Sequence, residues 1–130
     1  MVDRCKNKKI DNLEGTMYFY PPETCNDETV DSDFDAFPLD IWALGVNLFA
    51  MTYLELPFIS KNKNYMELVE TISKAEVVFP ETRTVSKELQ QLILQMLEKN
   101  PKKRITCKEI KQNAWINKGK ERLDKKRYVI

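Results

Sequence analysis

The 130-residue sequence contains no histidine, and it has only three glycines and three cysteines. The missing histidine removes the commonest general base and metal ligand, and it excludes Ser–His–Asp and Cys–His nucleophilic sites. The three glycines lie too far apart to form a GxGxxG or a GxxxxGK[ST] phosphate loop. Cys5, Cys25 and Cys107 form no CxxC pair, so we expect neither a zinc site nor a disulfide framework. A reducing cytoplasmic or nuclear setting fits this cysteine content best.

We also expect neither a signal peptide nor a membrane-spanning segment. Residues 1–14 are charged, form no periodic pattern and lead into no apolar segment. The most apolar stretch, residues 41–54, is shorter than the about 20 residues that a membrane span needs. The acidic connection at 27–35 has neither the ligand spacing nor the central glycine of a calcium loop. We therefore expect no membrane association and no metal in this chain.

The net charge of +1 conceals a strong asymmetry along the chain. Residues 1–100 contain 10 basic and 17 acidic side chains, whereas residues 101–130 contain 11 basic and 3 acidic ones. This basic end is the one compositional hint of an anionic partner. We interpret residues 117–130 as a solvated surface helix or a frayed end. The alternative is a calmodulin-type or anionic-surface helix, whose apolar edge would consist of Ile116, Leu123 and Ile130. We expect no nucleic-acid binding, because few aromatic residues lie among these lysines.

The central feature of the sequence is an apolar helix predicted at residues 38–53. Its apolar residues occupy nearly every helical face, which is typical of a buried core helix. Pro38 suits the first turn of such a helix, and the Leu56-Pro57 pair ends it. Asp40 lies at the entrance, where a carboxylate is favoured by the helix dipole.

Shorter helices are predicted on both sides of it. A short helix is expected at 22–24, after the Pro-Pro pair, and residues 77–80 form an isolated extended run. The three later helices begin at Asn64 (a capping pair with Glu67), Ser86, and Thr106 (a capping box with Glu109). Asn100-Pro101 ends the second of these, and the third is expected to bury Ile110, Ala114 and Trp115. The predicted fold is mainly α, with four main helices, long loops and no convincing sheet.

Three sequence blocks then occur in a fixed order. Residues 15–23 read GTMYFYPPE, residues 40–45 read DIWALG, and residues 89–115 read LQQLILQMLEKNPKKRITCKEIKQNAW. Together they resemble the C-terminal part of a eukaryotic protein kinase domain, whose pattern is GTxxYxAPE, then DxWxLG, then DPxxRxT and HPW. The resemblance spans about residues 13–116. Within that family, the length of the connection from residue 23 to residue 40 and the sequence LILQMLEKNPKKRIT most resemble the calcium/calmodulin-dependent kinase kinases and their relatives.

The resemblance implies an incomplete, kinase-like helical lower lobe without an N-terminal lobe. Residues 1–14 would be an activation-segment remnant in loop form, 15–116 a partial lower lobe, and 117–130 a basic extension. Residues 1–14 contain no serine or threonine, so they offer no phosphorylatable hydroxyl of that kind.

By the same resemblance, Glu23 pairs with Arg104, and Asp40 accepts hydrogen bonds from backbone amides of the catalytic loop. Without the family, Glu23 would be a surface acid, Arg104 a solvated base and Asp40 a helix-terminal acid. Trp42 and Gly45 would be packing residues, with the glycine allowing close backbone approach.

Substrate contacts are expected from the first block. Thr16 resembles the threonine that supports the catalytic Asp and Lys in serine/threonine kinases; without the family it would be an ordinary loop residue. The substrate-binding wall would consist of Thr16, Met17, Tyr18, Phe19, Tyr20 and Pro21. Pro21 replaces the usual alanine, Met17 the usual proline, and Asn113-Ala114 the usual His-Pro pair. We regard these changes as conservative in packing.

The sequence contains no Gly-rich loop, VAIK-type lysine, HRD or DFG motif, so nucleotide binding, the catalytic base and the magnesium ligands are missing. We expect a fragment of a Ser/Thr protein kinase that is inactive alone, with ATP and Mg²⁺ used by the intact parent. The alternative is a non-enzymatic helical interaction module. Expected partners are a protein substrate or the missing kinase portion.

Bare apolar faces of the 38–53 helix also predict self-association, aggregation or partial unfolding.

Overall fold

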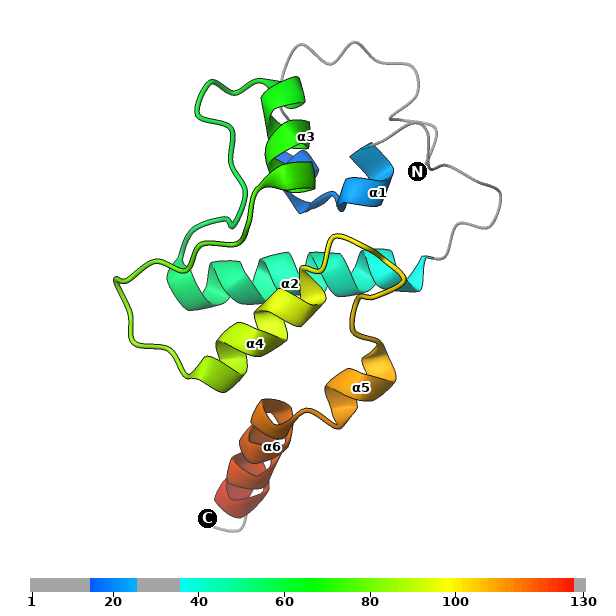
Figure 1. Cartoon of the computed structure of the whole chain (residues 1–130). Coiled ribbons are helices and arrows are strands. Elements are labelled where there is room, and N and C mark those ends of the chain that lie inside the picture. Colours follow the sequence, from blue (N-terminus) through cyan, green and yellow to red (C-terminus); the bar gives the residue numbers. More distant parts are fainter. Residues whose placement is uncertain (1–14, 26–35, 128–130) are drawn as a thin grey trace.

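The computed structural model describes residues 15–25 and 36–127, and every regular element in them is helical (Figure 1). The elements are the 3-10 helix η2 (Gly15–Phe19) and the α-helices α1 (Pro22–Cys25), α2 (Phe37–Tyr53), α3 (Tyr65–Lys74), α4 (Lys87–Met96), α5 (Cys107–Lys111) and α6 (Ala114–Arg127). The predicted mainly α fold is confirmed. The segments expected as loops at 1–14 and 27–35 lie outside the described residues.

Helix α2 is the centre of the arrangement. In Figure 1 it runs across the middle of the molecule, with α1 and α3 above it and α4 crossing in front of it. Pro38 occupies the first turn, as predicted, and the helix continues for 17 residues. It ends at Leu54, whose φ of 60° is left-handed and whose N–H donates to the Ala50 carbonyl at 2.8 Å. The sequence thus predicted this element to within one residue at its start.

One side of α2 forms most of the core. Its buried residues pack against apolar side chains of η2, α3, α4 and the 54–58 turn. The fully buried large side chains of the molecule are Trp42, Phe49, Phe58, Leu68, Ile72, Leu92, Ile93, Met96 and Val46. Aromatic rings extend the core along α2, since Phe49 lies 4.9 Å from Tyr53 and 6.0 Å from Phe79 between ring centroids. The interpretation of α2 as a core helix therefore holds for this side, whereas Leu44 and Met51 on the other side are exposed.

The start of α3 differs from the predicted capping pair. Asn64 is the N-cap, and its side chain accepts a hydrogen bond from the Met66 N–H at 2.9 Å. Glu67 does not cap this helix; its carboxylate accepts from the Ser60 hydroxyl at 3.1 Å. That hydroxyl oxygen in turn accepts from the Asn64 N–H at 2.9 Å. The capping pair was wrong because a serine outside the helix competes for the glutamate.

The region after Thr106 also differs from its prediction. Thr106 caps α5, and its hydroxyl oxygen accepts from the Glu109 N–H at 3.3 Å. The helix then breaks at Gln112, and the Asn113 side chain accepts from the Trp115 N–H at 2.9 Å, so that Asn113 opens α6. Instead of one helix that buries Ala114 there are two, and Ala114 is exposed.

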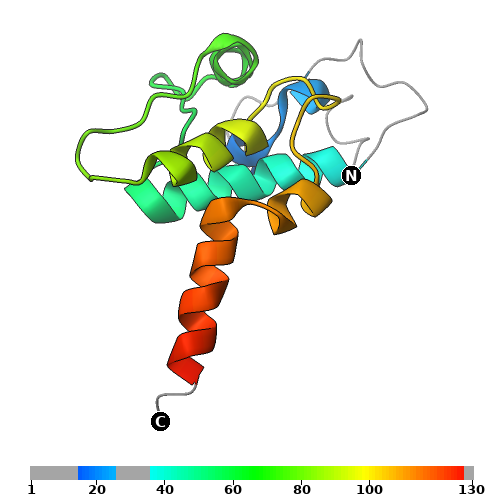
Figure 2. The same ribbon diagram turned by 60° about the horizontal axis from the view of Figure 1, so that its bottom comes forward.

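Helix α6 extends away from the rest of the molecule (Figure 2). Its first turn is half-buried through Trp115 and Ile116, and Lys118 is joined to Glu88 of α4 at 2.9 Å. Beyond that pair its described side chains are exposed. Within residues 15–25 and 36–127, no helix has the length and apolar character needed to span a membrane.

Candidate functional site

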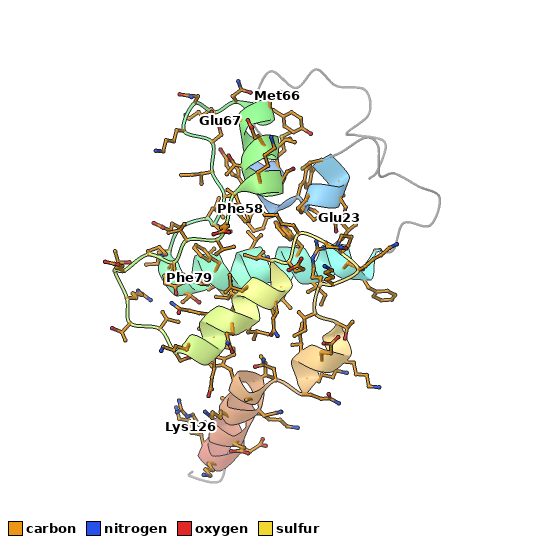
Figure 3. The ribbon with its side chains drawn as sticks, in the orientation of Figure 1. Glu23, Phe58, Met66, Glu67, Phe79 and Lys126 are labelled. Carbon is orange, nitrogen blue, oxygen red and sulfur yellow. The ribbon has the colours of Figure 1, made fainter. Side chains whose placement is uncertain are left out.

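Arg104 and Glu23 meet in the interior, although 81 positions separate them in the sequence. The Arg104 side chain is 0% exposed and that of Glu23 is 11% exposed. Their contact is bidentate, with Nη1 to Oε1 at 2.6 Å and Nη2 to Oε2 at 3.0 Å. This geometry is the strongest form of a carboxylate–guanidinium pair. It ties α1, where Glu23 is labelled in Figure 3, to the turn between α4 and α5.

Backbone carbonyls satisfy the rest of the Arg104 guanidinium. Nε donates to the Glu98 carbonyl at 2.8 Å, and Nη1 donates to the Pro38 carbonyl at 2.7 Å. Nη2 makes a longer contact of 3.5 Å with the Lys99 carbonyl. Each of the five guanidinium N–H donors therefore has an acceptor. A buried charge is stable only when it is compensated in this way.

The Trp42 ring packs against the Arg104 guanidinium. Its ring centroid is 5.0 Å from the Arg104 Cζ atom, and it stacks on Phe58 with a centroid separation of 5.7 Å and an interplanar angle of 12°. Guanidinium stacking on an indole adds a cation–π attraction. The Trp42 Nε1–H has no hydrogen-bond partner among the described residues. Trp42 thus packs between the buried ion pair and the aromatic core.

At Gly45, helix α2 approaches α4 closely. A Cβ atom added at Gly45 would come within 2.7 Å of the Met96 Cβ and 3.1 Å of Leu97 Cδ2. Since Met96 Cβ is fixed to its backbone, the two helices must separate to accept any larger residue.

Lys99 adds a second charged contact, beside both the Trp42 and the Phe58 rings. Its Nζ donates to the Ile72 carbonyl near the end of α3 at 2.6 Å and lies 4.6 Å from the Phe58 ring centroid. Burial lowers the pKa of the Lys99 ammonium, and the neighbouring Glu98 opposes this effect. Sequence reasoning missed this residue, and nothing in its local pattern distinguishes it from the lysines that follow it.

The predicted substrate wall divides into an inner and an outer part. Met17 and Pro21 are buried, whereas Tyr18, Phe19 and Tyr20 are half-buried against the core and retain exposed area. The Tyr20 N–H donates to the Met17 carbonyl at 3.2 Å, which closes the turn. Thr16 lies within η2, and its side chain is outside what the structure describes. The available surface here is therefore aromatic.

Asp40 is exposed in the first turn of α2. Its carboxylate takes part in no hydrogen bond or ion pair among the described residues. This placement fits a helix-terminal acid, and it also leaves the carboxylate open to donors from outside the described residues.

The donor chemistry does not fit a nucleotide–metal site. Within the described part of the chain, no three His, Cys, Asp or Glu side chains cluster closely enough to hold a metal ion. The sequence has no glycine-rich loop whose backbone amides could cradle phosphates. The described residues of the first block present a partly aromatic surface through Tyr18, Phe19 and Tyr20.

Comparison with known proteins agrees with the sequence blocks. The protein kinase domain model matches residues 1–116. A probable serine/threonine-protein kinase of Dictyostelium discoideum is 35% identical over 101 residues, covering 78% of this chain and 14% of the relative. A CBL-interacting serine/threonine-protein kinase of Arabidopsis thaliana is 33% identical over 105 residues, 81% of this chain and 23% of the relative. A calcium/calmodulin-dependent protein kinase kinase of Caenorhabditis elegans is 34% identical over 110 residues, 84% of this chain and 20% of the relative.

The matches thus span less than a quarter of the length of these relatives. They include kinase kinases and plant CBL-interacting kinases at similar identity, so they do not separate these subfamilies.

Proposed function

The chain belongs to the protein kinase domain family, and from this premise we propose that it is a lower-lobe segment of a Ser/Thr protein kinase. The parent enzyme transfers the γ-phosphoryl group of ATP to a protein hydroxyl. The names of the similar proteins support the Ser/Thr class, and the GTMYFY block supports it because tyrosine kinases carry a different loop there. We propose that the parent belongs to the calcium/calmodulin-dependent kinase kinases.

The observation that carries this proposal is the buried Arg104–Glu23 pair. It fixes α1 and the preceding η2 turn to the α4–α5 turn, across the N-terminal end of α2. A surface held by an ion pair with compensated donors is rigid, as a substrate-positioning surface must be. In this proposal Tyr18, Phe19 and Tyr20 face the protein substrate, and Thr16 supports the catalytic residues of the parent.

The 130 residues by themselves are proposed to be inactive. Nucleotide, Mg²⁺ and the catalytic base belong to motifs that are missing from this sequence. We therefore assign ATP and Mg²⁺ to the parent enzyme and derive no chemical step from the residues present. The partners of the segment are then the protein substrate and the remaining kinase portion, in the cytoplasm or the nucleus.

A second candidate is a non-enzymatic helical module that binds partners. The exposed apolar side chains Leu44 and Met51 on one face of α2 favour it, because a contiguous apolar patch on a protein surface marks an interaction site. This candidate needs no upstream kinase motifs.

Sequencing the transcript upstream of Met1 separates the two candidates. An in-frame HRD and DFG would establish the kinase segment, and an in-frame stop codon would favour the interaction module. Calorimetric titration of the 130-residue chain with ATP and Mg²⁺ provides a second readout. We expect no heat of binding, and measurable binding would contradict the proposed division of roles.

A further inference from the structure

The C-terminal end of α3 is completed by a side chain from another part of the chain. The Thr71 carbonyl accepts a hydrogen bond from the Ala75 N–H at 2.9 Å, and the backbone becomes extended at Ala75. The next carbonyl, that of Ile72, receives no backbone donor from beyond the helix among the described residues. Lys99 supplies the donor, since its Nζ lies 2.6 Å from the Ile72 carbonyl oxygen. The last carbonyls of a helix need such partners from outside the helix.

The surroundings of the Lys99 Nζ atom show why this hydrogen bond matters. No carboxylate of the described residues lies within ion-pair distance of it. Its other neighbours are the ring centroids of Phe58 at 4.6 Å and Trp42 at 5.9 Å. Burial lowers the pKa of the Lys99 ammonium, so the charge by itself favours a solvated position. The donated hydrogen bond and the two rings therefore determine where this side chain lies.

Few buried side chains hold α3 to the rest of the molecule. Leu68 and Ile72 are its buried residues, whereas α4, which has the same length of 10 residues, buries four. Irregular segments at 54–64 and 75–86 connect α3 to its neighbours in the chain. A helix of this length is marginal by itself in water, and an element with few buried contacts opens at a low free-energy cost. The Lys99 contact is therefore a substantial part of what holds the C-terminal end of α3.

Helix α3 in turn lies against the segment that carries the aromatic η2 surface. It packs on α1, and Figure 1 shows both helices above α2. The buried residues of α3 belong to the same core cluster as Met17 of η2. The main chain of Lys99 also meets the ion pair that fixes α1, because Arg104 Nη2 lies 3.5 Å from the Lys99 carbonyl oxygen. The 97–100 turn thus contacts α3 through a side chain and Arg104 through the backbone.

We propose that Lys99 is a positioning residue, which holds α3 against α1 and thereby supports the aromatic η2 surface from behind. Without the Nζ donor, the buried Ile72 carbonyl loses its hydrogen bond and α3 opens locally. Helices α2 and α4 keep their mutual packing in that opening, whereas η2 and α1 lose the helix that covers them. The inference goes beyond the proposed function, and it requires only the internal contacts of the chain.

Hydrogen–deuterium exchange of the full 130-residue chain, read by mass spectrometry of its peptides, tests this coupling. Lys99→Met keeps an unbranched apolar side chain beside the Phe58 ring and removes the donor. We expect amides of α3 and of η2–α1 to exchange about tenfold faster or more, because a buried acceptor is left unsatisfied. Amides of α2 and α4 should change by less than about twofold. Lys99→Arg keeps a donor that can stack on a ring, so its exchange should stay close to that of the unchanged chain.

Lys74 provides the matched control at the same end of α3. Its ammonium is 3.2 Å from the Glu70 carboxylate within the helix, and the two side chains are 75% and 67% exposed. Lys74→Met therefore removes the same charge and makes the same side-chain replacement without removing a contact between elements. We expect it to change α3 exchange by about twofold at most.

Four outcomes would overturn the proposal. Equal acceleration in α2, α4 and α3 would mean that Lys99 supports global stability and positions nothing in particular. Faster exchange in α3 alone would show that α3 does not support the η2 surface. Equal effects of Lys74→Met and Lys99→Met would assign the effect to charge at the helix end, and unchanged exchange in Lys99→Met would show that the contact holds nothing. The kinase-segment proposal is tested separately, by the upstream sequence.

Discussion

At the scale of single residues, the buried Arg104 is a main link between separate segments of the fold. It joins α1, the first turn of α2 and the α4–α5 turn through one buried guanidinium. We predict that Arg104→Met lowers the free energy of unfolding by roughly 3–5 kcal/mol, because the largely buried Glu23 carboxylate loses its bidentate guanidinium partner. Urea denaturation followed by circular dichroism measures this loss.

The exposed Lys118–Glu88 pair is the control for Arg104. Its side chains are 60% and 46% exposed, so Lys118→Met should change stability by at most about 1 kcal/mol. If Arg104→Met and Lys118→Met had equally small effects, the buried pair would not be a main support of the fold. If Arg104→Met prevents folding altogether, the milder Glu23→Gln should show an intermediate loss.

Lys99 gives a prediction for alkaline pH. Its pKa is lowered by burial, so the folded chain releases this proton at a lower pH than the unfolded chain does. The unfolded state then binds more protons in the window just below the ordinary lysine pKa of 10.5, and stability rises with pH there. We expect wild type to gain stability relative to Lys99→Met as the pH rises from 8 toward 10.5. A difference between the two that is independent of pH, or that shrinks, would contradict this assignment.

At the scale of elements, two glycines in helices have opposite expected effects. Gly45→Ala should destabilise the fold by about 1–3 kcal/mol, because the new Cβ meets the Met96 Cβ and forces α2 and α4 apart. Gly119→Ala on α6 should instead stabilise the helix by about 0.5–1 kcal/mol, since nothing lies within 4 Å of its added Cβ. Thermal unfolding of the two variants side by side checks both signs. The close α2–α4 packing would be disproved if Gly45→Ala were neutral or stabilising.

The elements also show which parts of the fold the sequence predicts. The caps at Ser86 and Thr106 were predicted because a cap depends on residues three positions apart. The cap at Asn64 was assigned the wrong partner, because Ser60 lies outside the helix pattern and competes for Glu67. The break before α6 was missed because apolar spacing continues across Asn113, although an asparagine before Ala114 is itself a helix-start signal.

The candidate site was less accessible to sequence reasoning than the helices. Periodicity and composition cannot pair Glu23 with Arg104 over 81 positions; only the resemblance to kinases suggested it. The Lys99 contact with the Ile72 carbonyl was not predicted at all, because it depends on how α3 packs beside the 97–100 turn. Long-range contacts follow from the packed fold and not from local patterns.

At the scale of the whole molecule, the chain combines a packed interior with two unusual surfaces. The basic helix α6 projects into solvent, where Lys126 is labelled in Figure 3, and helix α2 exposes the apolar side chains of Leu44 and Met51. The packed interior contains the Arg104–Glu23 pair and carries the aromatic η2 surface. In our proposal the ion pair and the aromatic η2 surface belong to the substrate-binding side of a kinase lobe. Phosphoryl transfer requires residues that this sequence lacks.

The most direct test of this account is a phosphoryl-transfer assay with radiolabelled ATP, Mg²⁺ and a mixture of serine- and threonine-containing peptides. The 130-residue chain is compared with a chain extended upstream through its natural reading frame. We predict no transfer above background for the 130 residues and clear transfer for the extended chain. Transfer by the 130-residue chain alone would contradict the proposed inactivity of the segment. An extended chain that contains no HRD and DFG and transfers nothing would contradict the assignment as a segment of an active kinase.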